Sequence, residues 1–248
     1  LSLLEAACQE CSYTVMSIFV NPLQFGENED YHKYPRDLTR DMKLAEKHGC
    51  SLLFAPDVSE IYPRKPLTEV NVRHLSDRLC GLSRPGHFTG VATVVTIFFN
   101  LIQPERAYFG QKDAQQAIIL KKMVADLHLP VLIKVLPTVR EADGLALSSR
   151  NEYLSFEERK AATFIFKGLM AGQQLLEKGE REVKKILAAI QEVWQQEPLL
   201  EPEYLEVVEI ENLSPLDWVD SQALVAAAVK VGGTRLIDNF LWPKGVLI

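Results

Sequence analysis

The chain has 248 residues, of which 47% are hydrophobic and 24% charged, so it can bury the core of one large domain or of two smaller ones. A net charge of −6 argues against nucleic acid as a partner, and no uncharged apolar run approaches the roughly 18 residues of a membrane span. The first residues lack the pattern of a signal peptide, and the sparse use of four cysteines is typical of a reducing cytoplasm.

Helix and strand patterns alternate through the first part of the chain. Strands are predicted from apolar, β-rich runs at 13–20, which reads as buried on both faces, and at 51–56, 68–72, 106–110 and 131–136. Helices are predicted at 1–12, at 35–49 with Pro35 near its start and Gly49 near its end, at 91–102 and at 113–129. This alternation indicates βαβ units and a mostly parallel sheet.

Cys8 and Cys11 form a C-x-x-C pattern on the first predicted helix. No second pair and no suitably spaced histidine completes a zinc site. We therefore expect two small buried residues on one helix face and no metal ligands.

The pattern changes after residue 150. Two helices are predicted at 155–179 and 180–197, followed by strands at 204–210, 223–231 and 234–241. Helices followed by neighbouring strands indicate a smaller α+β domain, so we predict an α/β domain over 1–138 and an α+β domain over 139–248. Ligand clefts commonly lie at such junctions.

Polar clusters directly follow two predicted strands. The residues concerned are Asn21 and Gln24 after one strand, and Gly110, Gln111, Lys112, Asp113 and Gln116 after another. Because ligands bind beyond the carboxyl ends of parallel strands, both clusters are expected at one sheet edge. Gly110 permits close approach of a ligand, and Lys112 beside a helix N-terminus favours an anion. Asp113 could cap that helix or bind ribose hydroxyls, and an ordinary capped turn with an exposed lysine remains the alternative.

Two further segments carry polar residues at a helix entry. In SRPGHFTGV, residues 83–91, Thr89 is the predicted N-cap, and His87 is more simply read as a structural histidine than as a catalytic base. Near residue 150, Ser155 with Glu158 makes a capping box, which leaves the SSR of residues 148–150 without a structural role. Two hydroxyls and a guanidinium suit the phosphates of a nucleotide.

Five motifs, NPLQF, SRPGHFTGV, YFGQKDAQQ, DGLALSSRNEYLS and TRLIDN, occur in this order, and together they closely resemble the pantoate–β-alanine ligase family. The resemblance covers nearly the whole chain. It implies a Rossmann-like nucleotide-binding domain of the class I synthetase and nucleotidyltransferase type with a smaller α+β C-terminal domain. It also implies a cytoplasmic homodimer that condenses pantoate with β-alanine, using ATP and Mg²⁺.

The resemblance also assigns residues to the substrates. Those expected to bind ATP are Gly110, Gln111, Lys112, Asp113, Val139, Leu147, Ser148, Ser149 and Arg150, with Val139 acting through its backbone. Those expected to bind pantoate or β-alanine are Asn21, Gln24, Tyr34, Arg84 and Gln116. Catalysis is expected to consist of charge stabilisation by Lys112, Ser149 and Arg150. Gln111 stands where the family commonly has Glu, and we expect it to act through its backbone.

The family's P-T-M-G-x-L-H-x-G-H motif does not occur in the sequence, and Leu1 falls directly after the place where it would end. The resemblance gives the two histidines of that motif a role in binding the triphosphate. We therefore expect the sequence to be part of a longer natural chain and to be close to inactive as it stands. A nucleotidyltransferase and a non-catalytic nucleotide-binding domain are the competing interpretations.

Overall fold

The computed structural model describes residues 1–26, 29–34 and 36–247, and the chain forms two compact units. Unit 1 comprises Leu1–Asp77, Gly81–Phe109 and Ile119–Leu136. Unit 2 comprises Arg78–Cys80, Gly110–Ile118 and Pro137–Ile248. Among the described residues, no helix combines the length and the apolar character needed to span a membrane.

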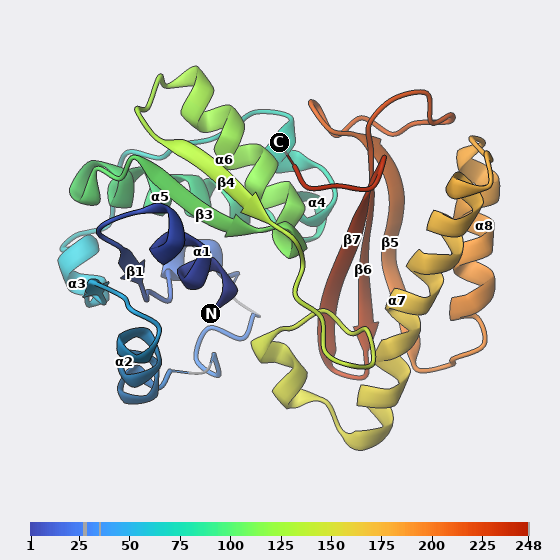
Figure 1. The fold of residues 1–248 in the computed structure, drawn as a ribbon, viewed down its shortest axis with the longest axis horizontal. Coiled ribbons are helices and arrows are strands. Elements are labelled where there is room, and N and C mark those ends of the chain that lie inside the picture. The colour runs from blue at the N-terminus through green and yellow to red at the C-terminus, as the bar shows by residue number, and fades with distance from the viewer. Residues whose placement is uncertain (27–28, 35, 248) are drawn as a thin grey trace. The chain divides into compact units, whose positions relative to one another are not determined.

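Unit 1 is an α/β arrangement with short strands (Figure 1). Its elements, including those that run on into unit 2, are α1 (Ser2–Glu10), β1 (Val15–Ser17), η1 (Pro22–Gln24), α2 (Leu38–Lys47), β2 (Leu52–Phe54), α3 (Val58–Ile61), η2 (Leu75–Asp77), α4 (Cys80–Ser83), α5 (His87–Ile102), β3 (Arg106–Gly110), η3 (Gln111–Asp113), α6 (Ala114–Asp126) and β4 (Leu132–Leu136). Strand β1 pairs with β2 in parallel, with Val15 opposite Leu52, and β3 pairs with β4.

Several predictions for this part of the chain are confirmed and some are wrong. The predicted strand 13–20 is reduced to β1, whose residues are half-buried or exposed rather than buried on both faces. Its ladder is short because β2 ends at Phe54, two residues before Pro56, which has no N–H to donate. Residues 68–72 form no strand.

Helices α1, α2 and α6 begin and end within three residues of the predicted places, whereas α5 begins at His87, four residues before the predicted start. Helix α2 begins after Asp37, whose carboxylate accepts a hydrogen bond from the Arg40 amide at 2.9 Å, and it ends before Gly49, which has a φ of +80°. Pro35 lies outside the described residues. Cys8 and Cys11 are half-buried rather than buried.

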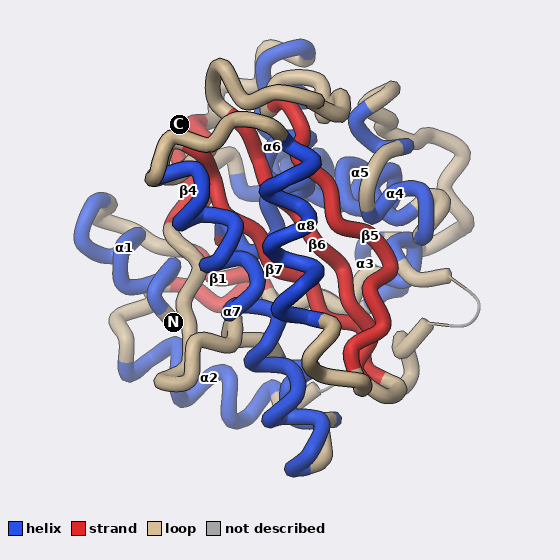
Figure 2. Tube along the Cα trace, turned by 90° about the vertical axis from the view of Figure 1, so that its right-hand side faces the viewer, coloured by secondary structure: helices blue, strands red, loops and turns tan. Residues whose placement is uncertain are grey.

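Unit 2 is built on an antiparallel sheet. Its elements are η4 (Ser149–Tyr153), α7 (Phe156–Glu177), α8 (Val183–Trp194), β5 (Leu200–Glu209), β6 (Ala223–Val231) and β7 (Thr234–Trp242), and the strand order is β5-β6-β7. Figure 2 shows α7 and α8 crossing one face of this sheet. All the helices and strands predicted after residue 155 are present.

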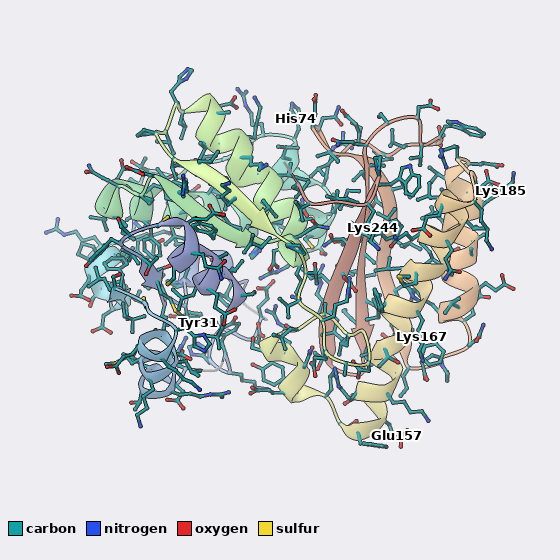
Figure 3. The ribbon with its side chains drawn as sticks, viewed as in Figure 1. Tyr31, His74, Glu157, Lys167, Lys185 and Lys244 are labelled. Carbon is teal, nitrogen blue, oxygen red and sulfur yellow. The ribbon has the colours of Figure 1, made fainter. Side chains whose placement is uncertain are left out.

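The core of unit 2 lies between these two helices and the sheet. Every second residue of β6 from Ala223 to Val231 belongs to it, as do Ile186 and Ile190 of α8. Gly172 of α7 lets the helices approach closely, because a Cβ there would lie 2.6 Å from the Ile190 side chain. The outer surfaces of α7 and α8 carry charged side chains such as Lys167 and Lys185 (Figure 3).

Candidate functional site

The turn η1 of unit 1 holds two of the predicted substrate residues in a fixed arrangement. Asn21 is the N-cap of the turn, and its Oδ1 accepts a hydrogen bond from the Leu23 amide at 3.2 Å. Its Nδ2 donates to the Gly90 carbonyl at 3.0 Å and to Gln24 Oε1 at 3.2 Å. The Asn21 side chain is therefore enclosed by partners, and the residue is only 1% exposed.

These contacts determine which way the Gln24 amide points. The orientation of Asn21 is fixed because a backbone N–H can only donate and a carbonyl can only accept. Its Nδ2 therefore faces Gln24, which must present its oxygen to it and turn its Nε2 elsewhere. The half-buried Gln24 can thus offer N–H donors to a ligand that carries acceptors, such as carboxylate or hydroxyl oxygens.

Tyr62 completes this arrangement and was not identified from the sequence. Its hydroxyl donates to Asn21 Oδ1 at 3.1 Å, and burial raises the pKa of Tyr62 to about 12. The phenol therefore remains a donor throughout the physiological range. No motif marks this residue in the sequence, and only its position in space links it to the turn.

The first turn of α5 approaches η1 closely because residue 90 is glycine. A Cβ at Gly90 would lie 2.4 Å from the Leu23 carbonyl oxygen and 2.8 Å from the Gln24 amide nitrogen. The N-cap of α5 is Gly86, with a φ of +81°, and not Thr89 as predicted. Thr89 instead accepts a hydrogen bond from Asn71 at 2.7 Å, within the first turn.

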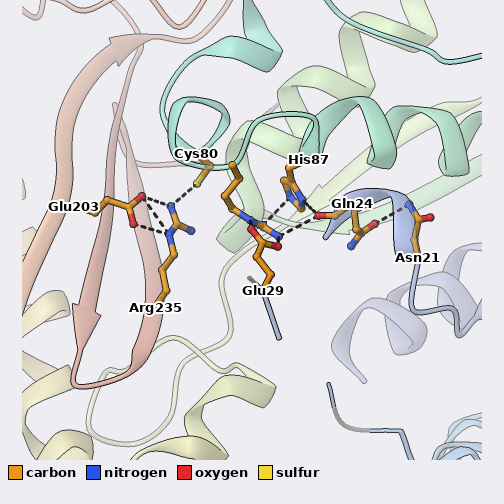
Figure 4. A network of polar contacts seen from close by, with 8 residues as sticks. Asn21, Gln24, Glu29, Cys80, His87, Glu203 and Arg235 are labelled. Carbon is orange, nitrogen blue, oxygen red and sulfur yellow. Dashed lines mark hydrogen bonds and ion pairs between the residues drawn. The ribbon is translucent and has the colours of Figure 1, made fainter. Parts of the chain in front are cut away.

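Arg84 lies beside the same turn and carries an ion pair. Its Nε and Nη2 donate to the two oxygens of Glu29 at 2.7 and 2.6 Å, and Nη2 also reaches the Gln24 carbonyl at 3.3 Å. Burial alone would raise the pKa of Glu29, but the hydrogen bonds and charge of Arg84 outweigh it, so this pKa is lowered. His87 contacts both Arg84 and Gln24, and Figure 4 shows its ring beside Gln24.

Tyr34 is close to this group through ring contacts. Its ring packs edge-on against Phe25, the residue that follows Gln24, at 5.9 Å between centroids. Tyr31, labelled in Figure 3, packs on the same Phe25 at 5.4 Å. The structure thus brings together four of the five predicted pantoate and β-alanine residues, all from unit 1.

The predicted nucleotide residues belong to unit 2. Gly110 precedes η3 with ordinary extended backbone angles, and a Cβ there would meet no atom within 4 Å. Neither the backbone conformation nor packing within the protein therefore requires glycine at position 110. The open space beside Gly110 is available to a ligand. Lys112 is half-buried and Asp113 is exposed. Asp113 is not the helix cap, because helical structure already begins at Gln111.

Two other residues of this segment have distinct surroundings. The Gln111 side chain is buried and lines a cavity of about 270 Å³ in unit 2, while its carbonyl is hydrogen-bonded to Asn239. The Gln111 carbonyl is therefore engaged within unit 2, and a backbone role for Gln111 toward a ligand stays a prediction. Gln116, the fifth predicted pantoate residue, is half-buried in the first turn of α6.

Two consecutive residues of β7 bind two segments of unit 2 that are predicted to bind the nucleotide. Asn239 Nδ2 donates to the carbonyls of Gln111 and Lys112, each at 2.9 Å. Asp238 is 3% exposed and accepts two hydrogen bonds from Arg140, at 2.6 and 2.9 Å. The TRLIDN motif contains both residues, but the sequence did not reveal what they anchor.

Arg140 lies in a hairpin-like loop that brings Val139 and Leu147 together. The Leu147 amide donates to the Val139 carbonyl at 2.9 Å, and Gly144 at the tip has a φ of +92°. Val139 and Leu147 are 44% and 55% exposed. Both apolar side chains are therefore exposed at the point where the two ends of the loop are hydrogen-bonded to each other.

The serine segment follows this loop and has a structural role that was not predicted. Ser148 Oγ accepts a hydrogen bond from the Arg150 amide at 3.3 Å and caps η4. The capping box of Ser155 with Glu158 is present as predicted. Ser149 is exposed and Arg150 is half-buried. Ser148, itself one of the residues expected to contact phosphate, therefore also shapes the turn that carries Ser149 and Arg150.

Comparison with known proteins agrees with these motifs. A sequence model of the family described as Pantoate-beta-alanine ligase matches residues 1–241. The pantothenate synthetase of Thermoanaerobacter sp. (strain X514) is 51% identical over 246 residues, which are 99% of this chain and 87% of that protein. The pantothenate synthetase of Acetivibrio thermocellus is 54% identical over 241 residues, which are 97% of this chain and 86% of that protein.

Solved structures give the same result. The pantothenate synthetase from Thermus thermophilus superimposes with a TM-score of 0.93 at 48% identity, over 96% of this chain and 87% of that one. The pantoate–β-alanine ligase from Francisella tularensis, solved with βγ-ATP and β-alanine, gives a TM-score of 0.77 at 30% identity, over 98% of this chain and 85% of that one.

Proposed function

This chain belongs to the pantoate–β-alanine ligase family, and from that premise we propose that it condenses pantoate with β-alanine, using ATP, through a pantoyl-adenylate intermediate. The match of the family model to residues 1–241 is the observation that carries the proposal. The products are pantothenate, AMP and pyrophosphate.

The proposed chemistry consists of two displacements. A pantoate carboxylate oxygen attacks the α-phosphorus of ATP, and the bond from that phosphorus to the bridging oxygen breaks to release pyrophosphate. The β-alanine amine then attacks the acyl carbon, loses a proton, and expels AMP as the new amide forms. Neither step requires a covalent bond to the protein, so its contribution is positioning and charge stabilisation.

The nucleotide roles fall on unit 2. We assign ATP binding to Gly110, Gln111, Lys112, Asp113, Val139, Leu147, Ser148, Ser149 and Arg150. Within this set, Lys112, Ser149 and Arg150 act on the charge that develops on the phosphates. The open space at Gly110 and the paired exposed side chains of the 139–147 loop support this assignment.

The acid substrates are assigned mainly to unit 1. Pantoate would bind Gln24 and Gln116, with Asn21, Tyr34 and Arg84 around it or around β-alanine. The donor-presenting orientation of Gln24 supports this, because pantoate offers carboxylate and hydroxyl oxygens. Buried hydrogen-bonding groups discriminate strongly against analogues that lack the matching polar group.

The metal ion, the oligomeric state and the cellular location are proposed from the family and not from the geometry of the site. We propose that ATP is used as its Mg²⁺ complex, with phosphate oxygens as the principal ligands, as is usual for this ion. The ion would offset phosphate charge during the first displacement. We also propose a homodimer in the cytoplasm, which size-exclusion chromatography with light scattering and cell fractionation would test.

The test is pantoate-dependent exchange of labelled pyrophosphate into ATP by the full-length protein without β-alanine. Exchange that needs pantoate supports the proposal. Exchange that needs a phosphorylated substrate instead would identify a nucleotidyltransferase. If the protein binds ATP but catalyses no pyrophosphate exchange with any of these substrates, it is a nucleotide-binding domain without ligase activity.

A further inference from the structure

Among the described residues, His87 at the N-terminus of α5 has polar contacts with Gln24 and Arg84, which both lie within unit 1. Its Nδ1 lies 2.8 Å from the Gln24 carbonyl oxygen, and its Nε2 lies 3.0 Å from Arg84 Nη1. The ring also packs edge-on against Phe88 at 4.8 Å between centroids, which restricts its rotation. Figure 4 shows the His87 ring beside the labelled Gln24, with a dashed line marking their contact.

The partners determine the protonation of the ring. A carbonyl oxygen only accepts, so Nδ1 must carry the hydrogen and donate it. A guanidinium only donates, so Nε2 must be unprotonated and accept. Both contacts can therefore be made only by the neutral imidazole with its hydrogen on Nδ1.

These contacts bear on the position of Gln24. Its side-chain oxygen is held by Asn21 at 3.2 Å, while its backbone carbonyl is held by His87 at 2.8 Å and more loosely by Arg84 at 3.3 Å. The His87 contact is the shortest of the three. Loss of this contact would allow the backbone of η1 to shift and would turn the Gln24 amide away from its ligand.

We propose that His87 is a positioning residue for Gln24 and acts through the neutral tautomer protonated at Nδ1. The proposal rests on the assignment of Gln24 to pantoate made above. His87 does not need to touch substrate or exchange a proton with it. Its role is to hold the carbonyl of Gln24 while Arg84 fixes the ring from the other side.

The same arrangement makes the contact sensitive to acid. If Nε2 were protonated, it and Arg84 Nη1 would both be hydrogen-bond donors, only 3.0 Å apart, and their hydrogen bond would be lost. Among the described residues, the charged groups beside the ring include the Arg84 guanidinium in direct contact and the Glu29 carboxylate bonded to it. Neither α5 nor η1 contains another ionisable side chain. Protonation of His87 is therefore expected to weaken the hold on Gln24.

Two isosteric variants separate the two contacts. His87→Asn places an amide nitrogen near the Nδ1 position and retains the donor to Gln24. His87→Gln places its amide near the Nε2 position and retains only an acceptor for Arg84. We expect His87→Gln and His87→Ala to raise KM for pantoate roughly tenfold, as for one lost hydrogen bond, and to affect kcat less. His87→Asn should remain within about threefold of the wild type and should lose its acid-side rise in KM.

A second measurement is independent of catalysis. In the wild-type protein, a long-range ¹H–¹⁵N spectrum of the histidine rings should assign His87 to the neutral form protonated at Nδ1 near pH 7.5. The form protonated at Nε2 would overturn the proposal, as would rescue of KM by His87→Gln rather than His87→Asn. If wild-type protein shows no pantoate-dependent exchange, the proposed function fails, yet the spectrum still decides the tautomer.

Discussion

Gly90→Ala tests whether the close approach of α5 and η1 sets the geometry of the substrate site. The added Cβ would lie 2.4 Å from the Leu23 carbonyl oxygen and 2.8 Å from the Gln24 amide nitrogen. Real Cβ atoms stay at least 3.0 Å from such neighbours, so η1 must move by about 0.6 Å or more. Both obstructing atoms belong to the backbone, which means that no side-chain rotation can relieve the contact.

The expected effect follows from that displacement. A misplacement of about 1 Å at a reacting group can lower a rate by about 10²-fold, so we expect kcat/KM for pantoate to fall by roughly 10- to 10²-fold. Overpacking is also expected to lower the free energy of unfolding by roughly 1–3 kcal/mol. The first quantity is measured by pyrophosphate exchange and the second by chemical denaturation.

Gly233→Ala is the matched control, because it makes the same chemical change in the β6–β7 turn, where a Cβ would meet nothing within 4 Å. It should leave exchange unchanged. If Gly90→Ala instead retained wild-type kcat/KM for pantoate, η1 would have to tolerate the shift. The reasoning that links helix approach to the position of Gln24 would then be wrong.

Three further predictions concern charge and anchoring. Lys112→Ala should slow adenylate formation by roughly 10²-fold or more with little change in unfolding, and near-normal exchange would remove Lys112 from the mechanism. Asp238→Ala should lower the free energy of unfolding by roughly 3–5 kcal/mol, because Arg140 loses a buried partner. Asp126→Ala, which removes one member of the exposed Lys122 pair, should lower it by less than about 1 kcal/mol. Equal losses in the two variants would contradict this reasoning. Because the pKa of Glu29 is lowered in the folded protein, its carboxylate stabilises the fold above its ordinary pKa of 4.5, and this stabilisation is lost as the pH falls through the lowered value. The difference in melting temperature between wild type and Glu29→Gln should therefore vanish at low pH, and a constant difference from pH 7 to pH 3 would disprove the linkage.

The strands of unit 2 were predictable because their pattern and packing agree. The apolar run of β6 is long, is bounded by turn residues and is buried along nearly its whole length. Its length and its turn boundaries therefore predicted a strand, although four of its nine residues are alanine, which is depleted in strands. The run 68–72 also contains β-branched residues, Thr68, Val70 and Val72, but the structure forms no strand there. A strand requires a partner, and composition alone does not supply one.

Caps and anchors were harder to predict. Thr89 is a good N-cap by residue type, yet the N-cap is the left-handed Gly86, three residues earlier, and His87 and Gly90 in the first turn contact η1. Tyr62 and Asp238 contact their partners over separations of 41 and 98 residues. Such contacts depend on the tertiary fold, and no pattern within a short window contains them.

The paired anchors on β7 link strand register to ligand binding. Side chains of consecutive strand residues point to opposite sides, so Asp238 and Asn239 can serve two different loops from one short stretch of backbone. A slip of β7 by one residue against β6 would exchange the two sides and release both loops together. A one-residue insertion in the tight β6–β7 hairpin should consequently abolish ATP binding, even if the sheet itself still forms. ATP binding would then depend on the register of a strand that need not touch the nucleotide.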